Sequence, residues 1–332
     1  MALFDLPLTE LERYLPDVPE PADFDEFWST TLAEARRHEP VRRLEPVRTG
    51  LRTLDTWDLE LAGFDGQPVL AWVTRPAGVD GPLPVVVEYV GYGRGRGLPI
   101  ERLTWASAGY AHVLMDTRGQ GSQYGTGGGT ADPVGSGPAA PGVLTRGIDD
   151  PAQHYYRRVF TDAVRAVDAA RTLPGVDPRR VAVVGNSQGG GIALAVAGLV
   201  GDLVAVLPSA PLLSHVRRAI GITDADPYAE LVRYLSVHRD AEERVLRTLS
   251  YLDGVHFARR ASAATIFSTG LRDTICPPST AFASFNHYGA LAAADGRSVD
   301  KEIAVYPYNH HEGGDAVHTA RQLDWLAPRL AG

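Results

Sequence analysis

A five-residue segment near the middle of the chain has the residue types and spacing of a nucleophilic serine. The segment Gly185-Asn186-Ser187-Gln188-Gly189 matches the pattern G-x-S-x-G. In this pattern the serine lies on a sharp turn between a strand and a helix, where glycines let the backbone pack closely. The N–H groups at the start of that helix then face the position where an oxyanion would form. The segment therefore predicts acyl transfer through Ser187.

The sequence on either side of the serine supplies the strand and the helix that such a turn requires. Arg180–Val184 is a β-branched run that ends at the first glycine, and Ile192–Ala197 is an apolar run typical of a buried helix. The bare pattern recurs by chance, so the alternative is a glycine-rich turn with an incidental serine. The succession of strand, turn and helix favours the nucleophile.

A serine hydroxyl is a weak nucleophile, so the site needs a base and an acid that orients the base. In the α/β-hydrolase fold the acid and then the histidine follow the serine, each at the C-terminal end of a strand. Asp273 follows the apolar run 264–269, and His310 and His311 follow the run 301–306. Asp273 could instead be an ordinary turn aspartate, but its place after a strand favours the orienting acid. Periodicity does not choose between the two histidines.

A glycine-rich loop after an early strand predicts the second half of an oxyanion hole. Residues 84–90 form an apolar run of the parallel-strand type, which leads into the glycine-rich loop 91–97. In hydrolases of this fold, the loop after such a strand contributes a backbone N–H to the oxyanion. A phosphate-binding loop is the alternative, but this loop lacks the G-K-[ST] ending.

Strands and helices alternate along most of the chain, and this alternation indicates the fold. Residues 55–75 read as two antiparallel strands that turn at Asp65-Gly66. Further strands are expected at 111–115 and 203–207, and helices at 100–108, 152–172, 278–290 and 314–328. The order predicts an α/β-hydrolase fold over residues 1–332, as a single domain with a mostly parallel central sheet and helices on both faces.

Three segments depart from the alternation. Residues 1–50 read as an N-terminal extension with one helix from Phe24 to Arg37. Residues 119–147 are rich in glycine and proline, most of all between 125 and 142, and a loop of this length tends to be functional. Residues 212–260 read as several short helices, an insertion that in this fold usually forms a lid or an assembly surface.

Composition excludes several classes of function. The 332 residues carry a formal net charge of −8 and no basic run, which argues against nucleic-acid binding. One cysteine, Cys276, allows no intramolecular disulfide. The N-terminus carries Asp5 and Glu10, unlike a signal peptide, and no apolar run approaches the roughly 18 residues of a membrane span. We therefore expect a cytoplasmic protein. The segment 310–312 is not H-E-x-x-H, so we expect no catalytic metal, and no cofactor.

Several short motifs spread over most of the chain are shared with one family of esterases. They are Val90-Gly91-Tyr92, Asp116-Thr117-Arg118-Gly119-Gln120-Gly121, Arg146-Gly147-Ile148, Tyr155-Tyr156-Arg157-Arg158, Gly185-Asn186-Ser187-Gln188-Gly189 and His311-Glu312. Together they resemble the acetyl xylan esterase / cephalosporin C deacetylase family, carbohydrate esterase family 7. The combination of R-G-Q, G-x-S-Q-G and H-E is far more specific than the serine motif alone.

The resemblance implies a role for each matching residue. The catalytic residues would be Ser187 as nucleophile, Asp273 as orienting acid and His311 as base, since His311 directly precedes Glu312. The backbone N–H groups of Tyr92 and Gln188 would form the oxyanion hole.

The resemblance also implies a structural role, a substrate class and an assembly. Arg118 and Gln120 match the R-G-Q signature and are expected to be structural. Family members deacetylate short xylo-oligosaccharides and cephalosporin C, are largely intracellular and form hexamers. Small acetylated substrates and a homohexamer are therefore expected here.

Two other functions compete with an acetyl esterase. A peptidase of the prolyl oligopeptidase type would usually carry a β-propeller, for which 332 residues leave no room. A catalytically inactive hydrolase fold that serves as a binding protein would typically lack a triad residue. All three candidates are present in order here, so the residues of the site favour an enzyme.

Overall fold

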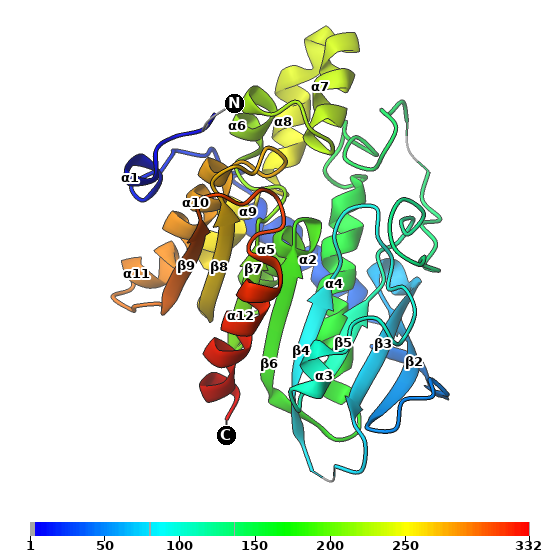
Figure 1. The fold of residues 1–332 in the computed structure, drawn as a ribbon. Coiled ribbons are helices and arrows are strands. Elements are labelled where there is room, and N and C mark those ends of the chain that lie inside the picture. The colour runs from blue at the N-terminus through cyan, green and yellow to red at the C-terminus, as the bar shows by residue number, and fades with distance from the viewer. Residues whose placement is uncertain (1–3, 80, 136, 332) are drawn as a thin grey trace.

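The computed structural model describes residues 4–79, 81–135 and 137–331. Within these residues the chain forms a nine-stranded sheet with the order β1-β2-β3-β5-β4-β6-β7-β8-β9 (Figure 1). The strands are β1 (Val41–Val47), β2 (Leu54–Ala62), β3 (Pro68–Pro76), β4 (Leu83–Tyr89), β5 (Ala111–Met115), β6 (Val176–Asn186), β7 (Ala205–Ser209), β8 (Ala264–Gly270) and β9 (Lys301–Tyr306). Strands β4 to β9 pair in parallel and β1 to β3 are antiparallel, which confirms the mostly parallel sheet.

Helices cover both faces of this sheet. They are α1 (Leu8–Leu11), α2 (Phe24–Ala35), α3 (Thr104–Ser107), α4 (Tyr155–Thr172), α5 (Gln188–Leu199), α6 (Val216–Ile222), α7 (Tyr228–Val237), α8 (Glu242–Ser250), α9 (Gly254–Arg260), α10 (Pro278–His287), α11 (Ala290–Ala294) and α12 (Asp315–Leu330). Alternate residues of β4 show the two faces. Val85 and Val87 join the core with α4 and α5, whereas Val86 joins a second core with Trp105 of α3 and Leu326 of α12. This confirms the α/β-hydrolase architecture.

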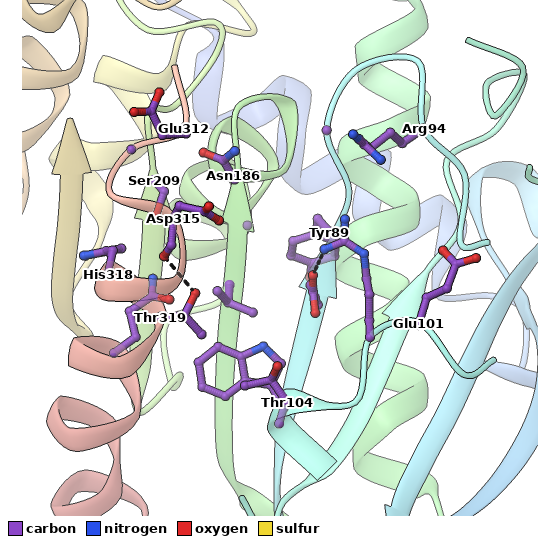
Figure 2. A pocket seen from close by; sticks show the side chains of 18 residues that line it. Tyr89, Arg94, Glu101, Thr104, Asn186, Ser209, Glu312, Asp315, His318 and Thr319 are labelled. Carbon is purple, nitrogen blue, oxygen red and sulfur yellow. Dashed lines mark hydrogen bonds and ion pairs between the residues drawn. The ribbon is translucent and has the colours of Figure 1, made fainter. Parts of the chain in front are cut away.

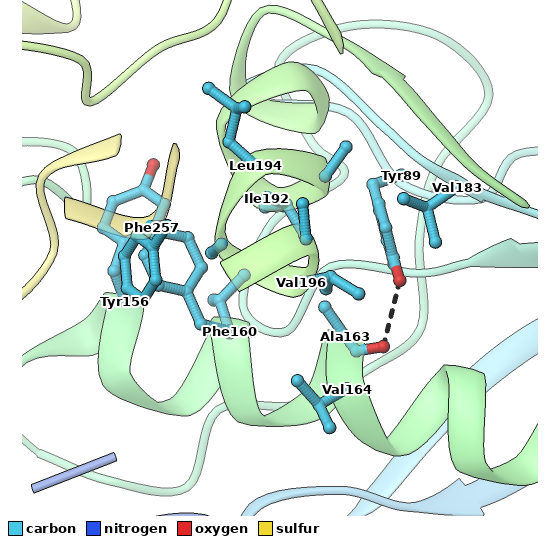
Figure 3. Close-up of a cluster of buried hydrophobic side chains, with 14 of the residues drawn as sticks. Tyr89, Tyr156, Phe160, Ala163, Val164, Val183, Ile192, Leu194, Val196 and Phe257 are labelled. Atoms are coloured by element: carbon cyan, nitrogen blue, oxygen red, sulfur yellow. Dashed lines mark hydrogen bonds between the residues drawn. The ribbon is translucent and has the colours of Figure 1, made fainter. Parts of the chain in front are cut away.

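The helix α5, which follows Ser187, is buried on all sides. The first ten residues of α5, 188–197, are buried because the helix lies between the sheet, α4 and α9. Phe160 of α4 meets Phe257 of α9 edge to face, with ring centroids 5.6 Å apart (Figure 3). The Tyr89 hydroxyl at the end of β4 donates to the Ala163 carbonyl of α4 at 3.0 Å. Packing on this side therefore fixes the end of β4 and the start of α5, which bear the candidate site.

The N-terminal segment contains a strand that the sequence did not predict. Residues 1–50 were expected to hold one helix, but Val41–Val47 forms β1 and pairs antiparallel with β2 at the edge of the sheet. No residue of β1 is fully buried, and the strand includes Arg42, Arg43 and Pro46, so it lacks the alternation of a half-buried strand. The predicted helix is present as α2.

Three helices of the segment 212–260, α6 to α8, lie beyond the C-terminal ends of the central strands, whereas α9 packs against α5 (Figure 1). Trp28 of α2 donates from Nε1 to the Tyr251 carbonyl just after α8 at 3.0 Å. Most apolar side chains of these three helices are buried in the chain itself, among them Val216, Leu231 and Tyr234. Among the described residues, no helix has the length and apolar character needed to cross a bilayer.

Candidate active site

Ser187 lies at the turn between β6 and α5 with a strained backbone. Its φ of 59° and ψ of −121° fall outside the ordinary regions for a residue with a side chain, at a cost of about 1–3 kcal/mol. The backbone is held there because the Ser187 N–H donates to the Ser209 carbonyl of β7 at 2.9 Å. A Cβ on Gly185 would collide with the backbone of Gly189, and one on Gly189 with the carbonyl of Tyr89. Both glycines are therefore required by the close packing of this turn.

The structure brings His311 and Asp273 to Ser187 as a chain of hydrogen bonds. His311 Nε2 lies 2.8 Å from Ser187 Oγ, and His311 Nδ1 lies 2.8 Å from Asp273 Oδ2. Asp273 is fully buried, and its Oδ1 accepts the backbone N–H groups of Ile275 at 2.8 Å and Cys276 at 2.9 Å. The carboxylate is thereby fixed so that Oδ2 can accept Nδ1–H, which leaves Nε2 free to accept the serine proton.

The neighbouring histidine points elsewhere. His310 is exposed, and its Nδ1 donates to the Arg272 carbonyl at 2.8 Å. Glu312 braces the same loop, accepting from Asn309 Nδ2 at 2.7 Å and from the His310 N–H at 3.1 Å. These bonds, that from Asn309 first, hold the pKa of Glu312 below its usual range. A Cβ on Gly270 would strike this loop, so the glycine at the end of β8 lets the loop approach the sheet.

Tyr92 and Gln188 lie on the two segments that flank the serine. Tyr92 is in the loop after β4, and Gln188 is the first residue of α5. Within the described residues, neither backbone N–H donates to another protein group. Both residues follow the C-terminal end of a parallel strand, beside the turn that carries Ser187. The two donors are thus available to an oxyanion formed at the serine.

Gln120 connects the loop that carries Tyr92 directly to the start of α5. The sequence did not reveal this contact. Gln120 Oε1 accepts the Gly93 N–H at 2.6 Å, and Gln120 Nε2 donates to the Gln188 side-chain Oε1 at 2.8 Å. The same Oε1 of Gln188 also accepts from the Tyr156 hydroxyl at 2.8 Å. The glutamine of the R-G-Q signature therefore holds the Tyr92 loop and the start of α5 at a fixed separation.

Arg118 lies deeper in the molecule and away from the serine. Its guanidinium is fully buried and forms a two-pronged ion pair with Asp162 of α4, from Nε at 2.6 Å and from Nη2 at 2.8 Å. Nη1 donates to Gln67 Oε1 at 2.6 Å. These bonds join the loop after β5 to α4 and to the turn before β3, so Arg118 acts on the shape of the loop.

Two cavities that share four lining residues lie beside the turn that carries Ser187. One, of about 620 Å³, is lined by Ser187 and His311 together with residues of the long loop and of the insertion, including Tyr124, Gly142, Glu230 and Arg233. The second, of about 580 Å³, shares Gly91, Arg94, Asn186 and Glu312 with the first and extends between α3 and α12. Figure 2 shows Asp315, His318 and Thr319 of α12 on one side of this second cavity. Its charged and hydroxyl groups suit a polyhydroxylated ligand better than an apolar one.

The described part of the chain contains no cluster of three or more His, Cys, Asp or Glu side chains placed to share a metal ion.

A family model described as Acetyl xylan esterase (AXE1) matches residues 1–329 of the chain. The acetyl esterase Axe7A of Xylanibacter ruminicola is 30% identical over 325 residues, which cover 96% of this chain and 70% of that protein. The solved structure of an acetyl xylan esterase from Paenibacillus sp. R4 superposes with a TM-score of 0.89 at 37% identity, covering 97% of this chain and 99% of the other. Acetyl xylan esterase 1 from Thermoanaerobacterium sp. JW/SL YS485 gives a TM-score of 0.87 at 30% identity and covers 99% and 100%.

Proposed function

Because this chain belongs to the acetyl xylan esterase family and is a carboxylic ester hydrolase, we propose that it deacetylates small carbohydrates. The substrates are acetylated xylo-oligosaccharides, with cephalosporin C as a further acetyl ester. The contact that supports this most directly is the 2.8 Å approach of His311 Nε2 to Ser187 Oγ, since both residues line the cavity of about 620 Å³. The catalytic unit is a single domain in which residues 1–50 and 212–260 are accessory segments.

The first half-reaction forms an acetyl-enzyme. Ser187 Oγ attacks the acetyl carbonyl carbon as its proton passes to His311 Nε2, and Asp273 holds the imidazole in position. The N–H groups of Tyr92 and Gln188 stabilise the negative oxygen of the tetrahedral intermediate. When the intermediate collapses, the bond to the sugar oxygen breaks and His311 gives its proton to the leaving alcohol.

The second half-reaction releases acetate. A water molecule gives a proton to His311 Nε2 and attacks the acetyl-Ser187 carbonyl, which again passes through an oxyanion at the same two N–H groups. Collapse breaks the bond to Ser187 Oγ, which takes back the proton from His311. One water is consumed for each acetate formed, and the chain returns to its starting state.

A panel of esters tests the proposed substrate class. We expect acetate release from acetylated xylo-oligosaccharides and from cephalosporin C, measured as kcat/KM for each beside longer acyl esters. A prolyl-peptide substrate should give no turnover, because a peptidase of the prolyl oligopeptidase type is the competing enzyme. Turnover of p-nitrophenyl acetate without any release from the acetylated sugars would contradict the substrate class and leave the esterase chemistry standing.

We also propose a cytoplasmic homohexamer whose sites open into an internal space. Most apolar residues of the insertion are buried within the chain, but Val232 and Val237 of α7 remain 39% and 70% exposed. Exposed apolar side chains on this helix are available for contact with another subunit in a closed assembly. Light scattering should therefore return about six chains, and oligosaccharides should be deacetylated much faster than polymeric xylan. A monomer at micromolar concentration would contradict the assembly, and equal rates on polymer and oligomer would contradict the size limit.

A further inference from the structure

A buried carboxylate without an ion-pair partner lies in the cavity above the serine. Glu230 belongs to α7 of the insertion, is 3% exposed and lines the same cavity as Ser187 and His311. Its partners in the described chain are a phenol and a backbone amide, and no described cation forms an ion pair with it. Arg233 on the same helix pairs with Asp226 instead. A charge buried without a cation is costly, so its hydrogen bonds must be specific for it to persist.

Three segments of the chain meet at this carboxylate. The Tyr92 hydroxyl donates to Glu230 Oε1, and the Leu144 N–H donates to Oε2 at 2.9 Å. The Val143 N–H donates in turn to the Tyr92 hydroxyl at 2.8 Å. Gly142 has a φ of 120°, and a Cβ there would fall on the Glu230 carboxylate. The loop after β4, the long glycine-rich loop and the helical insertion are thus joined through one side chain.

In the hydrogen bond between Tyr92 and Glu230, the phenol is the donor and the carboxylate is the acceptor. Burial raises the pKa of the Tyr92 phenol, and the nearby Glu230 raises it further, so this hydroxyl keeps its proton and serves as the donor. Burial also raises the pKa of Glu230, while the bonds from Tyr92 and Leu144 favour its ionised form. An ionised carboxylate accepts on both oxygens, which matches the two donors aimed at it.

The position of the Tyr92 backbone depends on contacts from both sides. On one side, the next residue is held by the bond from the Gly93 N–H to Gln120 at 2.6 Å. On the other side, the Tyr92 side chain is held by Glu230 and by the Val143 N–H. Stabilisation of an oxyanion depends steeply on where the donor lies, so loss of either support lets the Tyr92 N–H move away from the reacting oxygen.

We propose that Glu230 is a positioning residue for the oxyanion hole, which it holds in place through the Tyr92 hydroxyl. The helical insertion then contributes to the geometry of the oxyanion hole in addition to lining the cavity. This inference rests on the proposed function, because it takes the Tyr92 N–H as an oxyanion donor.

A double-mutant cycle between the two side chains tests the link. Glu230→Gln keeps the shape but turns one acceptor into a donor that faces another donor, and Tyr92→Phe removes the hydroxyl. We expect each single variant to lower kcat for p-nitrophenyl acetate at least about tenfold with KM changed less than about twofold, because the loss appears only in the transition state. The kcat of the double variant should be no more than about threefold below that of the less active single variant, because both changes break the same interaction.

Two further measurements separate positioning from general damage. Glu242→Gln makes the same carboxylate-to-amide change on α8, where the side chain is 63% exposed, and should leave kcat within about twofold. Methylboronic acid forms a tetrahedral adduct on a catalytic serine, so its inhibition constant should rise in Glu230→Gln by about the same factor as kcat falls. A defect in the substrate cavity alone would raise KM and leave inhibition by the boronic acid unchanged.

The outcomes distinguish this inference from the function on which it rests. A Glu230→Gln variant with kcat within about twofold of wild type, or losses that multiply in the double variant, would overturn the positioning role. If Glu230→Gln is unfolded at the assay temperature, the kcat of Tyr92→Phe is the test. This variant keeps the hydrogen bond between Glu230 and Leu144. A wild-type protein that does not cleave p-nitrophenyl acetate would instead refute the proposed function, and the inference with it.

Discussion

Ser187→Ala should lower kcat for p-nitrophenyl acetate by a factor of about 10⁴ or more while the protein remains folded. The variant loses the only atom that can form the acetyl-enzyme, and water would have to attack the ester directly. Alanine meets the same positive φ of 59° as serine does, so the backbone strain at the turn is not relieved. The measurements are kcat, the amplitude of the acetyl-enzyme burst and the melting temperature.

A matched variant shows whether the loss is specific to the nucleophile. Ser268 is another buried serine, on β8, which β7 separates from β6, and its backbone carbonyl accepts the Ala210 N–H at 2.9 Å. Ser268→Ala keeps that bond and should leave kcat within about twofold of wild type. Retention of more than about a tenth of the wild-type kcat in Ser187→Ala would refute the assignment of the nucleophile.

The parts of the fold that the sequence predicted are those in which one local pattern determines the structure. β4 contains the apolar run 85–87, and the second half of β6 is the apolar run 181–184 that leads into Gly185, so the buried parallel strands and the turn at Ser187 follow from the residues themselves. β1 has no such pattern, because an edge strand need not bury either face and can tolerate Arg43 and Pro46. The place of β1 depends on its pairing with β2, and the residues of β1 themselves do not encode that pairing.

The supports of the site could not be predicted for a related reason. Gln120 lies 27 residues from Gly93 and 68 from Gln188, and Glu230 lies 138 residues from Tyr92. The R-G-Q signature marks Gln120 as structural but does not name its partners, and the sequence around Glu230 does not distinguish it from a solvated glutamate on a helix. Only the folded arrangement of strands β4, β5 and β6 brings the segments together.

The adjacent histidines give the second prediction of large effect. His311→Ala should lower kcat about as much as loss of the nucleophile does, by about 10⁴ or more, because within the described part of the chain only His311 offers a base to Ser187 Oγ. His310→Ala removes an exposed imidazole whose Nδ1 bonds the Arg272 carbonyl, and should change kcat less than about tenfold. Both variants are assayed with p-nitrophenyl acetate, with the melting temperature as a check of folding.

The pair is a demanding test because the two residues share their chain position, residue type and loop. Periodicity does not separate them, and it is the family resemblance that favours His311, which directly precedes Glu312. In the structure the two side chains have different partners. His311 lies between Asp273 and Ser187, while His310 bonds the Arg272 carbonyl in the loop after β8. If His310→Ala abolished turnover and His311→Ala retained it, the base would be His310, and the loop 309–312 would have to rearrange on binding substrate.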